Sequence, residues 1–223
     1  MTIEAILFDM DGTLVDSNDH HVRAWDEAFR SAGYEFDAQT IHDQIGKGAD
    51  MLVPTLLPGL DTPQREALGD AHGDVFKARY LNSVQPFAKA RDLLEKAHGC
   101  GQRVVIASSS SQQEIDHYLD RLDAHSFVTA VTTKDDVESS KPAPDIFEAA
   151  LKKLGSPAPD TVMVVGDTPY DIEAAARCGL RTVAVLSGGF SAESLRAAGA
   201  VALYADVAEL LGAYETSPLG LRT

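Results

Sequence analysis

Phe8-Asp9-Met10-Asp11-Gly12-Thr13-Leu14 follows an apolar run, residues 3–7, that is typical of a short buried strand. The carboxylates of Asp9 and Asp11 therefore emerge where a strand ends and where Gly12 lets the chain turn. In open parallel α/β sheets, ligands bind at the carboxyl ends of the strands. The segment predicts a functional site at the edge of such a sheet.

The two carboxylates suggest a metal-assisted reaction. Like charges so close together resist joint ionisation unless a cation lies between them. Mg²⁺ takes oxygen ligands from one or two carboxylates and from substrate phosphate, so one Asp could attack while the other moves a proton. A calcium loop is excluded, because its closing Glu would fall at His20 when counted from Asp9. A plain surface turn stays open as an alternative.

The length, composition and charge of the chain limit the classes of protein to which it can belong. The 223 residues suit one large or two small domains, and a chain that is 44% hydrophobic and 24% charged is ordinary for a globular protein. A net charge of −15 without basic clusters argues against binding to nucleic acid or to an anionic membrane. We see no apolar run of the ~18 residues needed to span a bilayer and no secretory signal. Cys100 and Cys178 lack metal-ligand spacing and suit a reducing cytosol. We expect a cytoplasmic protein, a monomer or a weak dimer.

Strand-like and helix-like segments alternate along most of the chain. Short apolar runs rich in β-branched residues predict further buried strands at 103–107, 127–131, 161–165 and 182–186. Helical patterns fall at 88–98, 112–122, 144–154 and 172–178. This order predicts an α/β fold, a Rossmann-like parallel sheet with helices on both faces. We assign residues 1–15 and 85–215 to this catalytic core and expect the tail, 216–223, to be frayed.

Residues 16–84 break this alternation. Helical patterns fit 20–32, 38–45, 49–57 and 64–81, with no convincing buried strand between them. We interpret the segment as an inserted α-helical cap, attached directly to the Asp pair and able to act as a lid. Trp25 is interpreted as part of the core of this cap.

The cap is expected to choose the substrate. Its candidate contacts are the basic residues His20, His21, Arg23, Lys47, Arg65, Lys77 and Arg79. Lys47 lies between Gly46 and Gly48, which free a turn that could point toward the core, although a solvated loop lysine is the alternative. Gly188-Gly189, after the last strong strand, is interpreted as a flexible loop.

Three more strand ends carry polar groups. Ser108-Ser109-Ser110-Ser111 offers hydroxyls and free N–H groups to an anion, or simply caps a helix. Lys141 could neutralise phosphate oxygens, or be an ordinary solvated lysine. Asp167 could complete a metal site, and Asp171 lies near a helix start, where it could serve as a cap. Together the strand ends supply the positioning and electrostatic parts that phosphoryl transfer needs.

These motifs, in this order, resemble the haloacid dehalogenase-like hydrolase superfamily, mainly its phosphatase branch with a small α-helical cap, such as phosphoglycolate phosphatase and β-phosphoglucomutase-like proteins. The resemblance implies Mg²⁺-dependent hydrolysis of a small phosphate monoester. Asp9 would be the nucleophile that forms an aspartyl-phosphate, and Asp11 the acid and base. The implied phosphate-binding residues are Gly12, Ser108, Ser109 and Lys141. The implied metal ligands are Asp9, the backbone carbonyl of Asp11, and Asp167, with Asp171 bound to the metal indirectly, through a ligand or a water molecule. His21 and Lys47 would be contacts from the cap to the substrate.

Three alternatives are weighed against the phosphatase. The dehalogenase branch lacks the second Asp, so Asp11 argues against it. The β-phosphoglucomutase branch resembles residues 21–25, but Thr13 and the pair Gly166-Asp167 favour a phosphatase. A phospho-receiver signalling domain would be about half as long and without an insert. The phosphate ester stays open among phosphoglycolate, sugar phosphates and nucleoside monophosphates.

Overall fold

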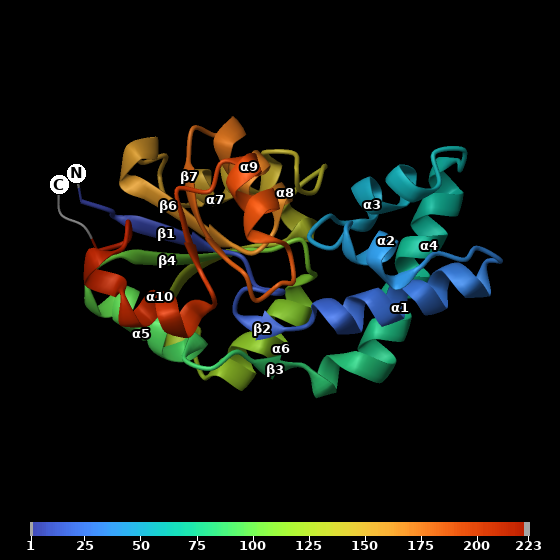
Figure 1. The fold of residues 1–223 in the computed structure, drawn as a ribbon, viewed down its shortest axis with the longest axis horizontal. Helices are drawn as coiled ribbons and strands as arrows, with labels where there is room; N and C mark the ends of the chain where they lie inside the picture. The colour runs from blue at the N-terminus through green and yellow to red at the C-terminus, as the bar shows by residue number, and fades with distance from the viewer. Residues whose placement is uncertain (1, 221–223) are drawn as a thin grey trace.

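The computed structural model describes residues 2–220 and contains a six-stranded parallel sheet in the order β5-β4-β1-β6-β7-β8 (Figure 1). The strands are β1 (Ala5–Phe8), β4 (Arg103–Ala107), β5 (Val128–Thr132), β6 (Val162–Gly166), β7 (Arg181–Val185) and β8 (Ala202–Tyr204). Strand β1 pairs with β4 on one side and β6 on the other. The end of β1 is therefore at the middle of the sheet edge, with polar loops from both neighbours beside it.

Helices cover both faces of the sheet, as the α/β prediction requires (Figure 1). Alternate residues of β1 point to opposite faces: Ile6 and Phe8 join one buried cluster, whereas Ala5 and Leu7 join another. The first cluster includes residues of α5 (Ala90–Gly99), α6 (Gln112–Leu122) and α10 (Val207–Gly212). The second includes residues of α7 (Asp145–Lys153) and α8 (Pro169–Arg177). The predicted fold class is confirmed.

A helical insertion forms the other half of the molecule in Figure 1. It contains α1 (Asn18–Ser31), α2 (Ala38–His42), α3 (Ala49–Leu56) and α4 (Thr62–Val75), then a π-helical turn η1 (Phe76–Tyr80) and a short 3₁₀ turn η2 (Leu81–Ser83). It has its own apolar cluster, in which Trp25 and Phe29 are buried, as expected for Trp25. The short strands β2 (Val15–Asp16) and β3 (Gln85–Pro86) pair antiparallel and bring the two ends of the insertion together.

The C-terminal part of the chain differs from the prediction. Strand β8, α10 and α9 (Ala192–Ala198) were not predicted, because each is short and only one face of it meets the core. The expectation of a frayed tail from residue 216 is wrong as far as the structure describes that tail. Ser217 and Leu219 are buried, and the Gln102 side chain donates a hydrogen bond to the Leu219 carbonyl. Residues 221–223 of the expected tail lie outside the described residues.

None of the helices in residues 2–220 is both long and apolar enough to cross a membrane.

Candidate active site

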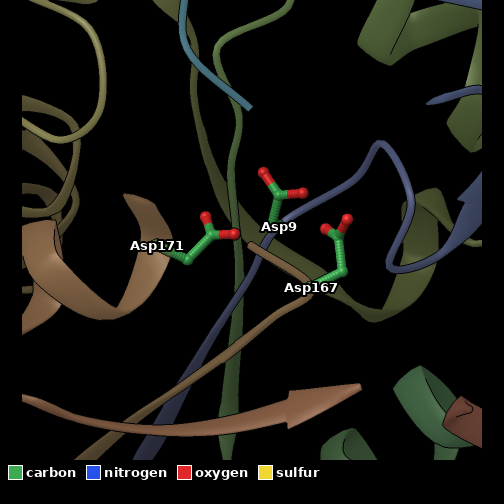
Figure 2. Close-up of side chains that lie close together, drawn as sticks. All are labelled: Asp9, Asp167 and Asp171. Atoms are coloured by element: carbon green, nitrogen blue, oxygen red, sulfur yellow. The ribbon is translucent and has the colours of Figure 1, made fainter. Parts of the chain in front are cut away.

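Three buried carboxylates meet at the carboxyl edge of the sheet. Asp9 directly follows β1, Asp167 directly follows the neighbouring strand β6, and Asp171 lies in the first turn of α8. One carboxylate oxygen from each lies within 4.8 Å of the others, and Figure 2 shows the three groups turned toward a common point. The topology thus brings together residues that are far apart in the sequence, as predicted from their places at strand ends.

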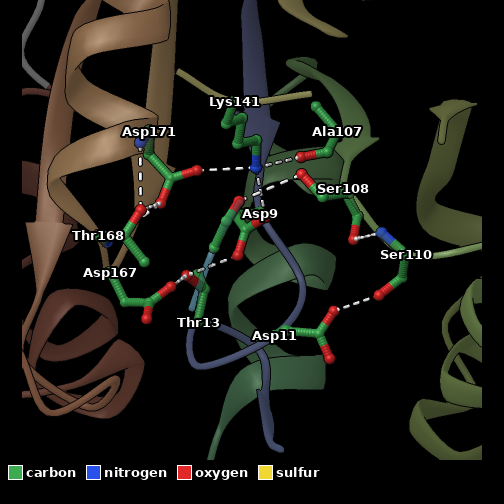
Figure 3. A network of polar contacts seen from close by, with 12 residues as sticks. Asp9, Asp11, Thr13, Ala107, Ser108, Ser110, Lys141, Asp167, Thr168 and Asp171 are labelled. Carbon is green, nitrogen blue, oxygen red and sulfur yellow. Dashed lines mark hydrogen bonds and ion pairs between the residues drawn. The ribbon is translucent and has the colours of Figure 1, made fainter. Parts of the chain in front are cut away.

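Lys141 is the cation of this cluster. Its ammonium lies 2.5 Å from Asp9 Oδ1 and 2.7 Å from Asp171 Oδ1, and it donates to the Ala107 carbonyl at 2.9 Å (Figure 3). The side chain is only 1% exposed, so the alternative of a solvated lysine is excluded. Burial opposes the charged form, but the carboxylates of Asp171 and Asp9 raise the pKa of Lys141 above its ordinary value. The ammonium therefore stays charged beside Asp9.

When all three carboxylates are ionised, the charges of the cluster do not balance without a further cation. Three carboxylates face one ammonium. Burial raises the pKa of Asp9 to about 7, with the charges of Asp171 and Asp11 adding to it and Lys141 opposing it. Burial, with the charges of Asp9 and Asp171, also raises the pKa of Asp167 well above its usual value. An oxygen-lined site with excess negative charge fits a hard divalent cation.

Asp11 points away from the three-carboxylate cluster (Figure 3). Its carboxylate accepts hydrogen bonds from Ser17 Oγ and Ser110 Oγ, both at 2.6 Å, and lies 3.2 Å from His21 Nε2. Burial opposes ionisation, but the hydrogen bond and charge of His21, helped by both serines, lower the pKa of Asp11 to about 2. The side chain of Asp11 is therefore outside the cluster, and ligation through its backbone carbonyl stays a prediction.

Sequence reasoning missed the residues that hold Asp167 in place. Thr13 Oγ1 donates to Asp167 Oδ1 at 2.9 Å, and Asn18 Nδ2 lies 3.0 Å from both Asp167 Oδ2 and the Gly188 carbonyl. Gly12 and Gly188 pack against this carboxylate without room for a side chain. A Cβ atom on Gly12 would lie 2.3 Å from Asp167 Oδ2, and a Cβ atom on Gly188 would lie 1.7 Å from the same oxygen. Gly188 is thus a packing partner of Asp167 rather than simply part of a flexible loop.

The close approach at Gly188 gives a steric prediction. Gly188→Ala should displace the Asp167 carboxylate and lower activity about 100-fold, because displacements of an ångström in an active site have effects of that size. Gly59→Ala is the matched control, since a Cβ there meets nothing within 4 Å. Steady-state kinetics of the two variants and the parent protein provides the measurement. Equal activity of the two variants would show that the Gly188 contact is unimportant.

The serines after β4 have separate contacts. Ser108 Oγ is buried and accepts from the Ser110 N–H at 3.1 Å, so its hydroxyl proton is available to an anion. Ser109 Oγ donates to the Gly46 carbonyl of the cap at 3.2 Å. The helix cap of α6 is Ser111, whose side chain accepts from the Glu114 N–H. Phosphate binding by Ser108 and Ser109 stays a prediction, as does that by Gly12, whose N–H donates to the Val15 carbonyl.

A cavity of about 340 Å³ lies between the cap and the sheet edge. Asp9, Asp11 and Ser108 line it from the core, and His21 and Lys47 line it from the cap. A volume of this size is at the lower end of the range for small-molecule sites. Further contacts join the cap rim to the core: the Gly48 N–H donates to Ser140 Oγ at 2.8 Å, and His42 Nε2 lies 2.9 Å from the Gly188 carbonyl.

The predicted basic residues of the cap separate into two groups. Three of them, His21, Lys47 and Lys77, line the cavity. The Lys47 ammonium binds Gln44 Oε1 at 2.6 Å and lies 4.5 Å from the centre of the Tyr170 ring, so it links cap to core. The remaining predicted residues with described contacts face the cap itself: His20 packs on Tyr80, Arg65 donates to the Leu60 carbonyl, and Arg79 pairs with Glu27.

Comparisons with known proteins show which family the chain resembles. The family profile described as haloacid dehalogenase-like hydrolase matches residues 6–185. The chain belongs to this family. It is 27% identical over 191 residues to a phosphoglycolate phosphatase of Aquifex aeolicus, covering 83% of this chain and 86% of that one. It is 28% identical over 191 residues to the pyrophosphatase PpaX of Oceanobacillus iheyensis, covering 83% and 84%.

A solved structure gives the same result in three dimensions. This hydrolase-family chain superposes on the crystal structure of a hydrolase from Pseudomonas syringae with a TM-score of 0.89 and 32% identity, covering 97% of this chain and 99% of the other. The protein is therefore a haloacid dehalogenase-like hydrolase with phosphatase relatives, and the predicted family is confirmed.

Proposed function

We propose that this hydrolase removes the phosphoryl group from a small phosphate monoester in a Mg²⁺-dependent reaction with an aspartyl-phosphate intermediate. One observation carries the proposal: the buried Asp9 carboxylate pairs with the buried Lys141 ammonium, has the carboxylates of Asp167 and Asp171 within 4.8 Å, and lines a cavity beneath the cap. Covalent catalysis needs an anionic nucleophile, and phosphoryl transfer needs positive charge around the transferring group.

In the proposed first step, Asp9 attacks phosphorus and the ester oxygen leaves with the proton of Asp11. Lys141 keeps its charge beside Asp9, where it favours the ionised nucleophile and then neutralises phosphoryl oxygens. Bound Mg²⁺ would offset negative charge between the carboxylates and the phosphoryl group, held by Asp9 and Asp167 with Asp171 acting through its bond to Lys141. Ser108 would donate its free hydroxyl proton to a phosphoryl oxygen.

In the second step, Asp11 takes a proton from the water that attacks the aspartyl-phosphate. A carboxyl with a pKa of about 2 is ionised in the ligand-free protein, which is the form that this step needs. To act first as an acid, Asp11 must gain a proton. Phosphate oxygens close to Asp11 would raise its pKa by charge repulsion and favour that protonation.

Release of inorganic phosphate from a panel of phosphorylated metabolites tests the function. The panel includes phosphoglycolate, sugar phosphates and nucleoside monophosphates, each with Mg²⁺ and with EDTA. We expect phosphate release from at least one ester with Mg²⁺ and its loss in EDTA. Full activity in EDTA, or no release from any ester, would contradict the proposal.

A sugar phosphomutase is the second candidate, because Gly48 and His42 hold the cap rim against Ser140 and Gly188 of the core, and a mutase must exclude water from its site. Incubation with β-glucose 1-phosphate, Mg²⁺ and a trace of the bisphosphate distinguishes the two reactions. A hydrolase releases phosphate and glucose. Accumulation of glucose 6-phosphate well ahead of phosphate would instead identify a mutase.

We further propose that the cap selects the leaving group through His21 and Lys47. Both line the cavity opposite Asp9. Lys47→Met should raise KM for the preferred metabolite several-fold and alter hydrolysis of a small aryl phosphate much less, because the aryl ester lacks the groups that the cap recognises. Lys152→Met, on the exposed side of α7, is the control. Equal effects on both esters would assign Lys47 only to cap closure.

A further inference from the structure

A chain of side-chain contacts runs from the cap helix α4 to Asp11. His72 on α4 has its Nε2 atom 3.3 Å from His21 Nδ1 on α1, and His21 Nε2 lies 3.2 Å from Asp11 Oδ1. The two helices lie side by side in the cap (Figure 1). Both histidines line the cavity.

We propose that His72 is a positioning residue, which fixes the ring of His21 and through it the orientation of the Asp11 carboxylate during proton transfer. This inference rests on the proposed function, because it assigns a role to His72 in the chemistry of Asp11. His72 itself does not touch the reacting atoms. It acts only through the ring nitrogen that it contacts on His21.

Each ring nitrogen of His21 has a polar partner, Asp11 at Nε2 and His72 at Nδ1. The Asp11 carboxylate already accepts from two serine hydroxyls, and it accepts from His21 Nε2 in the same way. His21 Nδ1 then faces His72 Nε2, and one of these atoms must donate to the other. Burial above all keeps the pKa of His72 well below its ordinary value, so this ring has one donor and one acceptor nitrogen. Since Nε2 of His21 donates to Asp11, Nδ1 of the neutral His21 ring is an acceptor, and His72 Nε2 can donate to it.

Aromatic stacking restrains both rings. His21 stacks on Phe76 with centroids 3.9 Å apart and planes 6° from parallel, and His72 stacks on Trp25 at 4.2 Å and 11°. Neither ring can tilt without losing its stacking contact. The hydrogen bond from His72 therefore selects among the few orientations that stacking still permits to His21, and a small rotation of His21 would move the Asp11 carboxylate.

Two variants of His72 test its hydrogen bond and its aromatic stacking separately. His72→Phe keeps a flat ring on Trp25 and removes the hydrogen bond, whereas His72→Gln loses the stacking and keeps an amide that can donate or accept. We would measure kcat/KM with Mg²⁺ for aryl phosphates of increasing leaving-group pKa. Good leaving groups need no proton, so impaired proton transfer appears as a steeper dependence on leaving-group pKa.

We expect His72→Phe to lower kcat/KM about tenfold for phenyl phosphate, a part of the 10²–10⁴-fold that acid–base catalysis supplies, and to change it little for p-nitrophenyl phosphate. The separate variant His72→Gln should show the same shallow dependence of kcat/KM on leaving-group pKa as the parent protein. If the Phe variant does not fold, His72→Met removes the same nitrogen. An unchanged dependence in the variants without the nitrogen, or no rescue by Gln, would overturn the inference.

A double-mutant cycle tests the route through His21. In a His21→Ala background, adding His72→Phe should have no further effect on the leaving-group dependence, because the contact that transmits it is gone. A persisting effect would contradict the inference. If the parent protein releases phosphate from no ester, aryl or metabolite, with Mg²⁺, the proposed function fails; if it releases phosphate and His72 has no effect, only the inference fails.

Discussion

Asp9→Asn should lower turnover by about 10⁴-fold while the protein remains folded, since loss of the proposed nucleophile would remove covalent catalysis altogether. The amide keeps the shape of the carboxylate but carries no negative charge and cannot form the aspartyl-phosphate. The fold should tolerate the change. Asp9 is buried with a pKa of about 7, so its ionised form is costly in the metal-free protein, and Lys141 keeps Asp171 as a partner.

Steady-state phosphate release and trapping of the phosphorylated enzyme together measure this effect. Glu138→Gln is the matched control, because Glu138 also lines the cavity but makes no described contact with the cluster. The control variant should retain its activity and its capacity to become phosphorylated. Substantial hydrolysis by Asp9→Asn, or loss of equal size in both variants, would exclude Asp9 as the nucleophile.

The sheet and its polar edge could be predicted because their signals are local. Buried parallel strands appear as short β-branched runs, and the topology places their carboxyl ends together whatever the sequence distance between them. Asp9 and Asp167 meet because β1 and β6 are neighbours. Lys141 reaches the same point from a loop that precedes α7. The helices of the cap follow from their apolar spacing in the same way.

The contacts that hold the site in place carried no local signal. Ser17, Ser110 and His72 have ordinary polar side chains, whose importance depends on where the cap packs against the core. The carboxyl group of Asp11 is hydrogen-bonded to Ser17, Ser110 and His21 and does not belong to the cluster of Asp9. The C-terminal tail from residue 216 is also short and polar in sequence, although Leu219 is part of the buried core cluster. Such features depend on tertiary contacts between segments far apart in sequence.

Asp167→Asn should have the second largest effect, with opposite signs for activity and for stability. Activity with Mg²⁺ should fall about 10²–10³-fold, because the proposed metal site would lose one of its carboxylate ligands. The geometry can survive: an amide oxygen can still accept from Asn18 Nδ2, and the Thr13 hydroxyl can accept from the amide nitrogen. Thr182→Val, at a buried hydroxyl without a hydrogen-bond partner among the described residues, is a control for a change in the core away from the cluster.

The stability of the metal-free protein should instead increase in Asp167→Asn at high pH. Burial and the neighbouring carboxylates raise the pKa of Asp167 in the folded protein above the ordinary value of 3.8, so folding favours its protonated form. Stability of the parent protein therefore falls as pH rises from that value through the raised pKa, and a neutral amide removes this contribution. The raised pKa of Asp9 contributes in the same direction between the ordinary value of 3.8 and about 7, and it does so in both proteins.

Thermal unfolding in EDTA at pH 5 and pH 8, repeated at pH 8 with Mg²⁺, measures the difference. We expect the variant to exceed the parent in melting temperature at pH 8, by a margin that shrinks at pH 5, because a lower pH favours the protonated form of Asp167. Mg²⁺ should stabilise the parent more than the variant, because the ionised cluster is the form that binds a cation. A variant less stable than the parent in EDTA at pH 8 would show that Asp167 holds the fold together. The opposite result would show that the carboxylate is kept at the sheet edge for binding and catalysis, at a cost in stability that a bound cation offsets.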